Sequence, residues 1–299
     1  MNLEQLRSFR AVAQEGGFSR AADALFLTQS TVSMQVATLE RELGVKLFHR
    51  MGRRVVLSHA GESMLGYAGR ILSQVDESRK TMASFRGLAA GELLVGASLT
   101  IGSYLLPELF GRFHKLHEGV RLLVDIAPTP RQVEQIVSGK MDLGLVEGPV
   151  GSPELVVEPF FIDQLALIVP PEHRWVGRSS VAVEELQEEP FLEREPTSGT
   201  REIVHGRLAE YGIELKPVLE LGSPEALKRA VRAGLGVAIV SRATLELELR
   251  TGLLVSLHVS GVELTRPFYT VVHKDRYVSP PLAAFLELLH ATYIVERSQ

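Results

Sequence analysis

A run of short polar side chains between Thr28 and Ala37 has the composition of a surface that meets base edges in duplex DNA. The outward positions of the helix expected here are Gln29, Ser30, Thr31, Ser33, Met34 and Ala37. None of them is acidic. Glutamine can pair with an adenine edge, hydroxyls can serve bases or phosphates, and apolar groups can contact a thymine methyl. The stretch therefore predicts a helix that enters the major groove.

A cluster of basic residues without any acid follows directly after Gly44. It comprises Lys46, Arg50, Arg53 and Arg54. The surrounding pattern, from Phe48 to Leu57, predicts a β-hairpin with Gly52 at its tip, and this hairpin would grip backbone phosphate or the minor groove. Two short amphipathic helices are common in proteins of every kind, so this hairpin is what favours DNA binding.

Hydroxyl residues gather at four turns where a predicted strand leads into a predicted helix. These turns are Ser98-Leu99-Thr100, Pro128-Thr129, Thr197 to Arg201, and Gly222-Ser223. Ligands of open α/β sheets bind at such strand ends, and helix N-termini there suit anions. A Ser or Thr at any one turn is more often just a helix cap. The third turn differs, because Arg201 can hold a carboxylate or phosphate with two hydrogen bonds.

The candidate effector-binding set collects these turns and their neighbours. It consists of Ser98, Thr100, Ile101, Thr129, Glu147, Ser198, Gly199, Thr200, Arg201 and Ser223. Glu147 ends a predicted strand, where it could accept a hydrogen bond from a ligand hydroxyl or amine, or simply face water.

Catalytic and metal-binding patterns find little support in the sequence, and we predict no catalytic residues, no metal and no cofactor. There is no G-x-S-x-G elbow, no P-loop and no HExxH, and His114 and His117 lack a third ligand. The absence of cysteine excludes disulfides and thiolate chemistry. Gly234-Leu235-Gly236 follows a helix pattern and precedes a strand, so it predicts a helix end rather than a dinucleotide site.

The elements that would position the DNA surface are three short helices. Met1 to Gly16 carries one apolar stripe, and Ser19 is a plausible cap for the helix holding Ala21 and Ala22. Thr28 would cap the helix that presents the polar face. Its opposite side carries Val32, Val36, Leu39 and Leu43, and Gly44 would end it.

A longer helix is expected from Ser58 to Gly87, because this segment contains no proline and shows a heptad pattern. The seam positions are Met64, Ala68, Ile71, Val75, Ser78, Met82 and Phe85. Such a seam predicts pairing with a second chain; the alternative is a helix packed on its own C-terminal domain.

Charge is distributed unevenly along the 299 residues. Residues 1–60 hold eight Lys and Arg against five Asp and Glu, whereas the whole chain has a net charge of −4. This asymmetry fits a nucleic-acid module joined to an acidic domain. The sequence lacks a signal-peptide pattern and a long uncharged apolar run, so we expect a cytoplasmic protein without a membrane partner. From Glu92 onwards, strand and helix patterns alternate, which predicts an α/β domain with a mainly parallel sheet.

From Leu3 to Gly61 the chain resembles the N-terminal domain of the LysR-type transcriptional regulators. The resemblance rests on Phe18-Ser19-x-Ala21-Ala22, Leu27-Thr28-Gln29-Ser30-x-Val32-Ser33-x-Gln35, Leu43-Gly44-x-x-Leu47-Phe48-x-Arg50 and Leu57-Ser58-x-Ala60-Gly61, all without a gap. Met34 and Ala37 depart from the family pattern, where basic residues are frequent, and this shifts weight to Arg53 and Arg54. The implied DNA-binding set is Ser19, Arg20, Gln29, Ser30, Thr31, Ser33, Met34, Gln35, Arg53 and Arg54.

The C-terminal part resembles the LysR effector domain, which is similar to periplasmic binding proteins. Gly96-Ala97-Ser98-x-Thr100-Ile101-Gly102 and Ser198-Gly199-Thr200-Arg201 resemble the branch that contains regulators of carbon fixation and sulfur assimilation, which implies a small anionic effector. Thr197 stands where that branch usually has glycine.

The resemblance implies three parts: a winged helix-turn-helix domain at 1–58, a linker helix for dimerisation at 59–87, and a two-lobed α/β effector domain at 91–299. Lobe I would comprise 91–162 and 267–299, and lobe II 163–266, with two crossing strands near Phe161 to Leu165 and Leu264 to Phe268. The family assembles as homodimers that pair into homotetramers, with operator DNA, a small anion and RNA polymerase as candidate partners. The competing hypothesis is an enzyme or metabolite-binding protein whose helical N-terminus serves only dimerisation.

Overall fold

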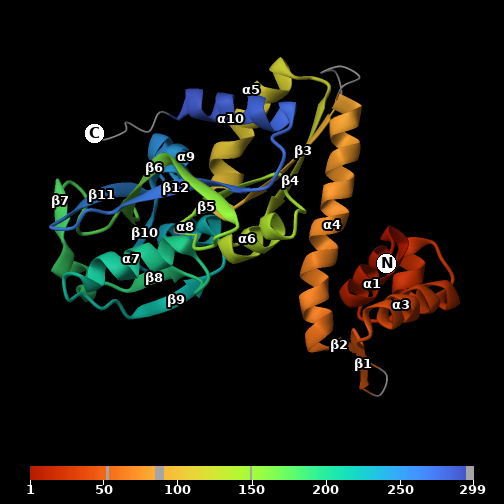
Figure 1. The fold of residues 1–299 in the computed structure, drawn as a ribbon. Helices are drawn as coiled ribbons and strands as arrows, with labels where there is room; N and C mark the ends of the chain where they lie inside the picture. The colour runs from red at the N-terminus through yellow and green to blue at the C-terminus, as the bar shows by residue number, and fades with distance from the viewer. Residues whose placement is uncertain (52–53, 85–90, 149, 294–299) are drawn as a thin grey trace. The chain divides into compact units, whose positions relative to one another are not determined.

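The fold is described from a computed structural model of the full chain, which covers residues 1–51, 54–84, 91–148 and 150–293. The chain divides into two compact units, the first Met1–Gly87 with Val137–Lys140 and the second Leu88–Ile136 with Met141–Gln299 (Figure 1). Within the described ranges, every helix is too short or too polar to cross a membrane.

The N-terminal unit begins with three short helices. They are α1 (Leu3–Glu15), α2 (Phe18–Leu25) and α3 (Gln29–Leu43). Asn2 and Gln5 form a capping box at the start of α1, and Gly16 ends it with φ +66°. The prediction that Ser19 caps α2 is wrong. The left-handed turn at Gly16 reverses the chain so early that Gly17 occupies the cap position and Ser19 already lies inside the helix.

The recognition helix α3 begins and ends where the sequence predicts. The Thr28 hydroxyl accepts a hydrogen bond from the Thr31 amide at 3.2 Å, and Gly44 ends the helix with φ +71°. Its inner side buries Val32, Val36 and Leu39 in a core shared with α1 and α2. Each buried aliphatic side chain contributes roughly 1.5–3 kcal/mol, so three of them fix the orientation of a helix of four turns.

The predicted hairpin is present as β1 (Phe48–Met51) and β2 (Arg54–Leu57), paired antiparallel with Phe48 opposite Leu57. Gly52 and Arg53 at the predicted tip lie outside the described residues.

The predicted long helix is α4 (His59–Ser84), and Ser58 caps it by accepting a hydrogen bond from the Gly61 amide at 3.0 Å. Its predicted seam is only partly available to a second chain. Met64, Ala68 and Ile71 pack in the same core as α1 to α3, and Ala68 is fully buried there. The heptad pattern identified an apolar stripe correctly, but helices α1 to α3 of the same chain cover the N-terminal half of that stripe. Val75 is half-buried and Met82 exposed, whereas Phe85 lies outside the described residues.

The C-terminal unit has two lobes, as predicted. The elements of lobe I are β3 (Gly91–Ala97), the π-helix η1 (Ile101–Leu105), α5 (Leu106–Leu116), β4 (Val120–Ile126), α6 (Thr129–Val137), β5 (Leu143–Glu147) and α10 (Pro280–Thr292). Those of lobe II are β7 (Ser180–Ala182), η2 (Val183–Glu188), β8 (Phe191–Arg194), α7 (Gly199–Ala209), β9 (Pro217–Leu221), α8 (Pro224–Arg232), β10 (Ala238–Ser241), η3 (Arg242–Thr244), α9 (Glu246–Thr251) and β11 (Val255–Ser260).

Two long strands pass between the lobes at the predicted places. They are β6 (Leu155–Val169) and β12 (Thr265–His273), which pair antiparallel from Thr265–Gln164 to His273–Leu155. In lobe I, β12 also pairs with β5; in lobe II, β6 pairs with β10 and β11. After β12 the chain returns to lobe I, where α10 packs Leu282, Phe285 and Leu289 into the core.

In the C-terminal unit, the prediction of a mainly parallel sheet holds only for the pairings that do not involve the crossing strands β6 and β12. The main sheet runs β4-β3-β5-β12-β6-β11-β7, and β3 pairs parallel with β4 and β5. All pairings of β6 and β12 are antiparallel. A strand that leaves a lobe and one that returns to it must run in opposite directions, so the mixed character follows from the two-lobed architecture.

Candidate functional site

The outer face of α3 presents the predicted polar side chains. Gln29, Ser30 and Met34 are exposed, while Thr31 and Ser33 are partly so. The Thr28 hydroxyl lies 2.9 Å from that of Ser30 and 2.8 Å from that of Thr31. The start of the helix therefore displays hydroxyls whose positions are already fixed by one another.

The remaining predicted DNA residues fall into three groups. Ser19 and Arg20 are exposed on α2. Gln35 is half-buried and accepts a hydrogen bond from the buried Ser8 hydroxyl, so it also joins α3 to α1. Arg54 begins β2.

Glu40 attaches the hairpin to the recognition helix. Its carboxylate accepts hydrogen bonds from Lys46 Nζ at 2.6 Å and from the Leu47 amide at 2.9 Å. Burial opposes ionisation of Glu40, but the hydrogen bonds from Lys46, Leu47 and Phe48 outweigh it and lower its pKa. Glu40 thus attaches the start of β1 to α3, and its charge is paired with Lys46.

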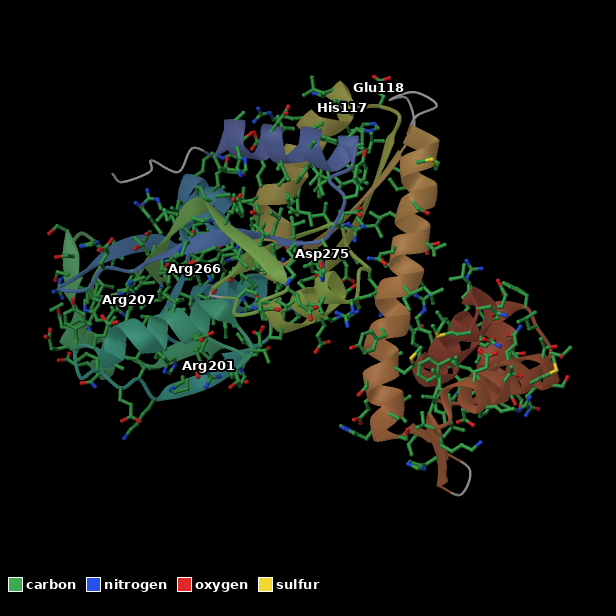
Figure 2. The ribbon with its side chains drawn as sticks, viewed as in Figure 1. His117, Glu118, Arg201, Arg207, Arg266 and Asp275 are labelled. Carbon is green, nitrogen blue, oxygen red and sulfur yellow. The ribbon has the colours of Figure 1, made fainter. Side chains whose placement is uncertain are left out.

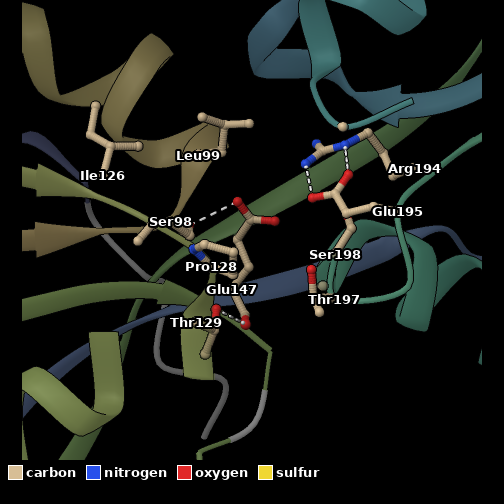
Figure 3. Close-up of a pocket in the computed structure, with 13 residues that line it drawn as sticks. Ser98, Leu99, Ile126, Pro128, Thr129, Glu147, Arg194, Glu195, Thr197 and Ser198 are labelled. Atoms are coloured by element: carbon tan, nitrogen blue, oxygen red, sulfur yellow. Dashed lines mark hydrogen bonds and ion pairs between the residues drawn. The ribbon is translucent and has the colours of Figure 1, made fainter. Parts of the chain in front are cut away.

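One cavity of about 240 Å³ lies in the C-terminal unit, and residues of all four predicted hydroxyl turns line it (Figure 3). Lobe I contributes Ser98, Pro128, Thr129 and Glu147, and lobe II contributes Arg194, Glu195, Thr197, Ser198, Gly199 and Gly222. The turns are spread along the chain from Ser98 to Gly222, yet the sheet topology brings their strand ends to one place.

Glu147 lies at the floor of this cavity and does not face open water. Its carboxylate accepts hydrogen bonds from Ser98 Oγ at 2.8 Å and the Thr100 amide at 3.2 Å, and it forms an ion pair with Arg266 at 2.5 Å. Burial would raise the pKa of Glu147, but Arg266, the two hydrogen bonds and the charge of Arg194 together lower it. Glu147 is therefore held as a carboxylate.

Arg266 connects this floor to both crossing strands. It is completely buried (Figure 2 labels it), and its Nε donates to Asp163 Oδ2 at 2.9 Å while Nη1 also donates to Thr200 Oγ1 at 3.0 Å. Ser241 of lobe II donates to Asp163 at 2.7 Å. Burial dominates at Asp163 and raises its pKa despite Arg266. The cluster of Glu147, Asp163 and Arg266 thus ties side chains of lobe I, lobe II and both crossing strands together.

The guanidinium that lines the cavity belongs to Arg194 and not to the predicted Arg201. Arg201 makes its ion pairs within the protein, with Glu193 at 2.9 Å and Glu220 at 2.8 Å. Arg194 ends β8 and is only 5% exposed. The geometry favours Arg194 as the cation that a bound anion would meet.

The other predicted effector residues are placed unequally around the cavity. Ser98, Thr129, Glu147, Ser198 and Gly199 line it. Thr100 and Thr200 are buried beside it and line a second cavity of only about 10 Å³, whereas Ile101 lies in the core of lobe I. Ser223 caps α8 by accepting from the Ala226 amide at 3.1 Å.

The charged residues of this site that the sequence analysis did not predict are Arg194, Glu195, Asp163 and Arg266. The sequence analysis predicted no strand at 191–194; the apolar pair Phe191-Leu192 just before Glu193 and Arg194 was the available signal for a short strand that ends in charged residues. Asp163 and Arg266 lie in the predicted crossing segments, where a charge within an apolar strand calls for a buried partner.

Comparisons with known proteins agree with this architecture. The family described as LysR substrate binding domain matches residues 86–293, and the family described as bacterial regulatory helix-turn-helix protein, lysR family, matches residues 3–62. The RuBisCO operon transcriptional regulator of Allochromatium vinosum is 36% identical over 289 residues, which cover 97% of this chain and 95% of that protein.

Solved structures with this fold include full-length regulators. Full-length OxyR from Pseudomonas aeruginosa superposes with a TM-score of 0.76 at 26% identity and covers 98% of this chain and 94% of that one. The CcmR regulatory domain of Synechocystis PCC6803 in complex with 2-PG superposes with a TM-score of 0.64 at 26% identity, over 69% of this chain and 98% of that domain. This chain therefore belongs to the LysR family of bacterial helix-turn-helix transcription regulators.

Proposed function

We propose that this regulator responds to a small anionic metabolite held between the two lobes of its C-terminal unit. The observation that carries the proposal is the convergence of four hydroxyl-bearing turns and Arg194 on one cavity. At about 240 Å³ the cavity is just below the roughly 300 Å³ at which pockets for drug-sized ligands begin, so it suits a metabolite of few atoms.

The start of α7 supports an anion in particular. Ser198 occupies its cap position without a side-chain hydrogen bond to the helix, in contrast to Ser223 at α8. Its hydroxyl and the first amides of α7 are thus available to a ligand, and a helix N-terminus carries partial positive charge. CcmR, a structural neighbour, is bound to 2-PG, and the similar protein from Allochromatium vinosum is a RuBisCO operon regulator. Both facts favour phosphorylated acids of carbon metabolism as candidate effectors.

A ligand that packs against the Ser98 and Thr129 turns of lobe I and bonds to Arg194 and Ser198 of lobe II would bias how the lobes close. The response requires that the effector bind one arrangement more tightly than another, since equal binding shifts nothing. We propose that a homodimer, with Val75 and Met82 of α4 at its interface, assembles to a homotetramer and transmits this bias to paired recognition helices on DNA.

The proposal can be tested on the full chain with DNA from the promoter next to its own gene. A thermal-shift screen of phosphorylated sugars, dicarboxylates, sulfate, nucleotides and 2-PG should find an anion that raises the melting temperature, because a ligand of the folded state stabilises it. The same anion should change the fluorescence-anisotropy titration of the operator. Binding to operator no tighter than to random duplex would instead favour a metabolite-binding protein without a DNA function.

Substitutions in the recognition helix and the hairpin should affect DNA binding differently. Gln29→Ala and Ser33→Ala should change the preference between operator variants, by roughly 1–3 kcal/mol per lost base contact. Arg53→Ala and Arg54→Ala should weaken binding to all sequences and lower the slope of log K against log salt by about 0.9 per phosphate contact. Anisotropy titrations at several salt concentrations separate the two effects, and identical profiles for both pairs would contradict these roles.

Phe26 has a backbone conformation that is unfavourable in the free protein, so its substitution is informative. It lies in the turn before α3, has φ +54° and is 96% exposed. A left-handed conformation costs a side chain such as Phe roughly 1–2 kcal/mol, and an exposed ring recovers none of it. Phe26→Asn should therefore slow amide hydrogen exchange in α3. We propose in addition that the exposed ring, which lies just before α3, contacts DNA, so Phe26→Asn should weaken operator binding, while Phe26→Tyr keeps both properties. Wild-type DNA affinity in Phe26→Asn would show that the ring has no contact with DNA.

A further inference from the structure

The effector cavity already contains an anion, which is the carboxylate of Glu195. Arg194 Nε donates to Glu195 Oε2 and Arg194 Nη2 to Glu195 Oε1, both at 2.8 Å (Figure 3). The two residues are adjacent in sequence, and both line the cavity. Arg194 is almost fully buried, while the side chain of Glu195 keeps 24% of its surface exposed.

This contact uses the edge of the guanidinium that a ligand would need. A carboxylate or phosphate binds arginine most strongly through two parallel hydrogen bonds, and Glu195 makes both of them. The other carboxylate of the cavity is also paired, because Arg266 neutralises Glu147. With these pairs formed and the Ser98 and Thr129 hydroxyls donating to Glu147, what the cavity still offers an anion is the Ser198 hydroxyl and the start of α7.

The exposed fraction of Glu195 indicates which partner can leave. The side chain of Arg194 is buried in the wall of the cavity, and the Arg194 carbonyl accepts a hydrogen bond from Arg201 Nη1 at 3.1 Å. The carboxylate of Glu195 is partly in solvent, so it can turn outwards and be hydrated at little cost. An incoming anion would thus replace Glu195 on a guanidinium that stays in place.

We propose that Glu195 is an internal competitor that occupies the anion site of the empty regulator and sets its affinity and selectivity for the effector. This inference rests on the proposed function of the cavity. A competitor of this kind raises the effector concentration needed for a response. It also discriminates against weakly pairing anions such as chloride or acetate, because only an anion that pairs with arginine as well as a carboxylate does can displace it.

Removing the charge of Glu195 should therefore improve anion binding. In Glu195→Gln we expect the affinity for inorganic phosphate, sulfate and 2-PG, measured by isothermal titration calorimetry on the full chain, to rise about tenfold. Acetate, which the wild type should bind weakly or not at all, should become detectable. The 2-PG concentration that changes operator binding in anisotropy should fall by the same factor as the dissociation constant.

A matched control exists in the same lobe. Glu185 forms an equally close two-bond pair with Arg178, at 2.8 and 2.7 Å, but neither residue lines the cavity. Glu185→Gln removes one carboxylate from lobe II as Glu195→Gln does, so it corrects for the general change in charge. It should leave anion affinity at the wild-type value.

The outcomes separate this inference from the proposed function. If Arg194→Gln loses anion binding and Glu195→Gln binds no more tightly than wild type, Arg194 holds the anion but Glu195 does not compete. Weaker binding in Glu195→Gln would make Glu195 a ligand-binding residue, for instance for a hydroxyl or ammonium group, and would also overturn the inference. If neither wild type nor Glu195→Gln binds any of these anions, the anion site itself is refuted.

Discussion

Arg266→Met is expected to lower the free energy of unfolding of the C-terminal unit by about 3–5 kcal/mol. The substitution keeps an unbranched side chain, though a shorter one, and leaves Glu147 and Asp163 as buried carboxylates without their shared cation. Both are at most 6% exposed, so water cannot replace Arg266. Urea unfolding of the full chain can be followed by the fluorescence of Trp175, which is the single tryptophan and lies buried in lobe II.

Two further variants identify the cause of this loss. Adding Glu147→Gln and Asp163→Asn to Arg266→Met should restore much of the stability, because Ser98 and Ser241 can still donate to the neutral amides' oxygens. Arg121→Met removes an arginine whose pair with Glu92 is exposed, and it should cost less than about 1 kcal/mol. An equal loss of unfolding free energy in Arg121→Met and Arg266→Met would show that burial of the cluster does not increase the cost of removing its arginine.

Arg194→Gln should lower the affinity for the anionic effector by roughly 10- to 100-fold, since a hydrogen bond to a charged group is worth about 1.5–3 kcal/mol. DNA affinity in the absence of effector should stay at the wild-type value, because Arg194 belongs to the C-terminal unit. Calorimetric titration with 2-PG measures the first effect, and anisotropy with operator DNA the second.

Arg201→Gln is the discriminating companion of that variant. The sequence predicts Arg201 as the anion-binding residue, whereas the structure pairs it with Glu193 and Glu220. We therefore expect a change in effector affinity well below that of Arg194→Gln, together with some loss of stability around β8 and β9. A larger loss of effector binding in Arg201→Gln than in Arg194→Gln would reverse the assignment.

Local signals in the sequence were sufficient for the limits of α3, although they misplaced the cap of α2 and put the 39% exposed Leu43 on the buried side. Thr28 and Gly44 delimit α3 because a cap and a left-handed glycine act on backbone groups within a few residues. The helical spacing of Val32, Val36 and Leu39 determines its buried side, and so the polar side that remains for DNA. The four hydroxyl turns could likewise be predicted, because each follows a strand pattern and precedes a helix pattern.

Patterns in the sequence thus determined many of the elements, their amphipathic faces and the kind of residues at the strand ends, and the family resemblance implied the two-lobed fold. Only the tertiary structure decided which partners they meet. Arg266 bonds to Glu147 and Asp163 across 119 and 103 residues, and Ala68 faces its own helical domain although its spacing equally suits a second chain. The physical reason is that periodicity and caps depend on neighbours along the chain, whereas the pairing of buried charges and the covering of an apolar stripe depend on which surfaces the folded sheet brings together.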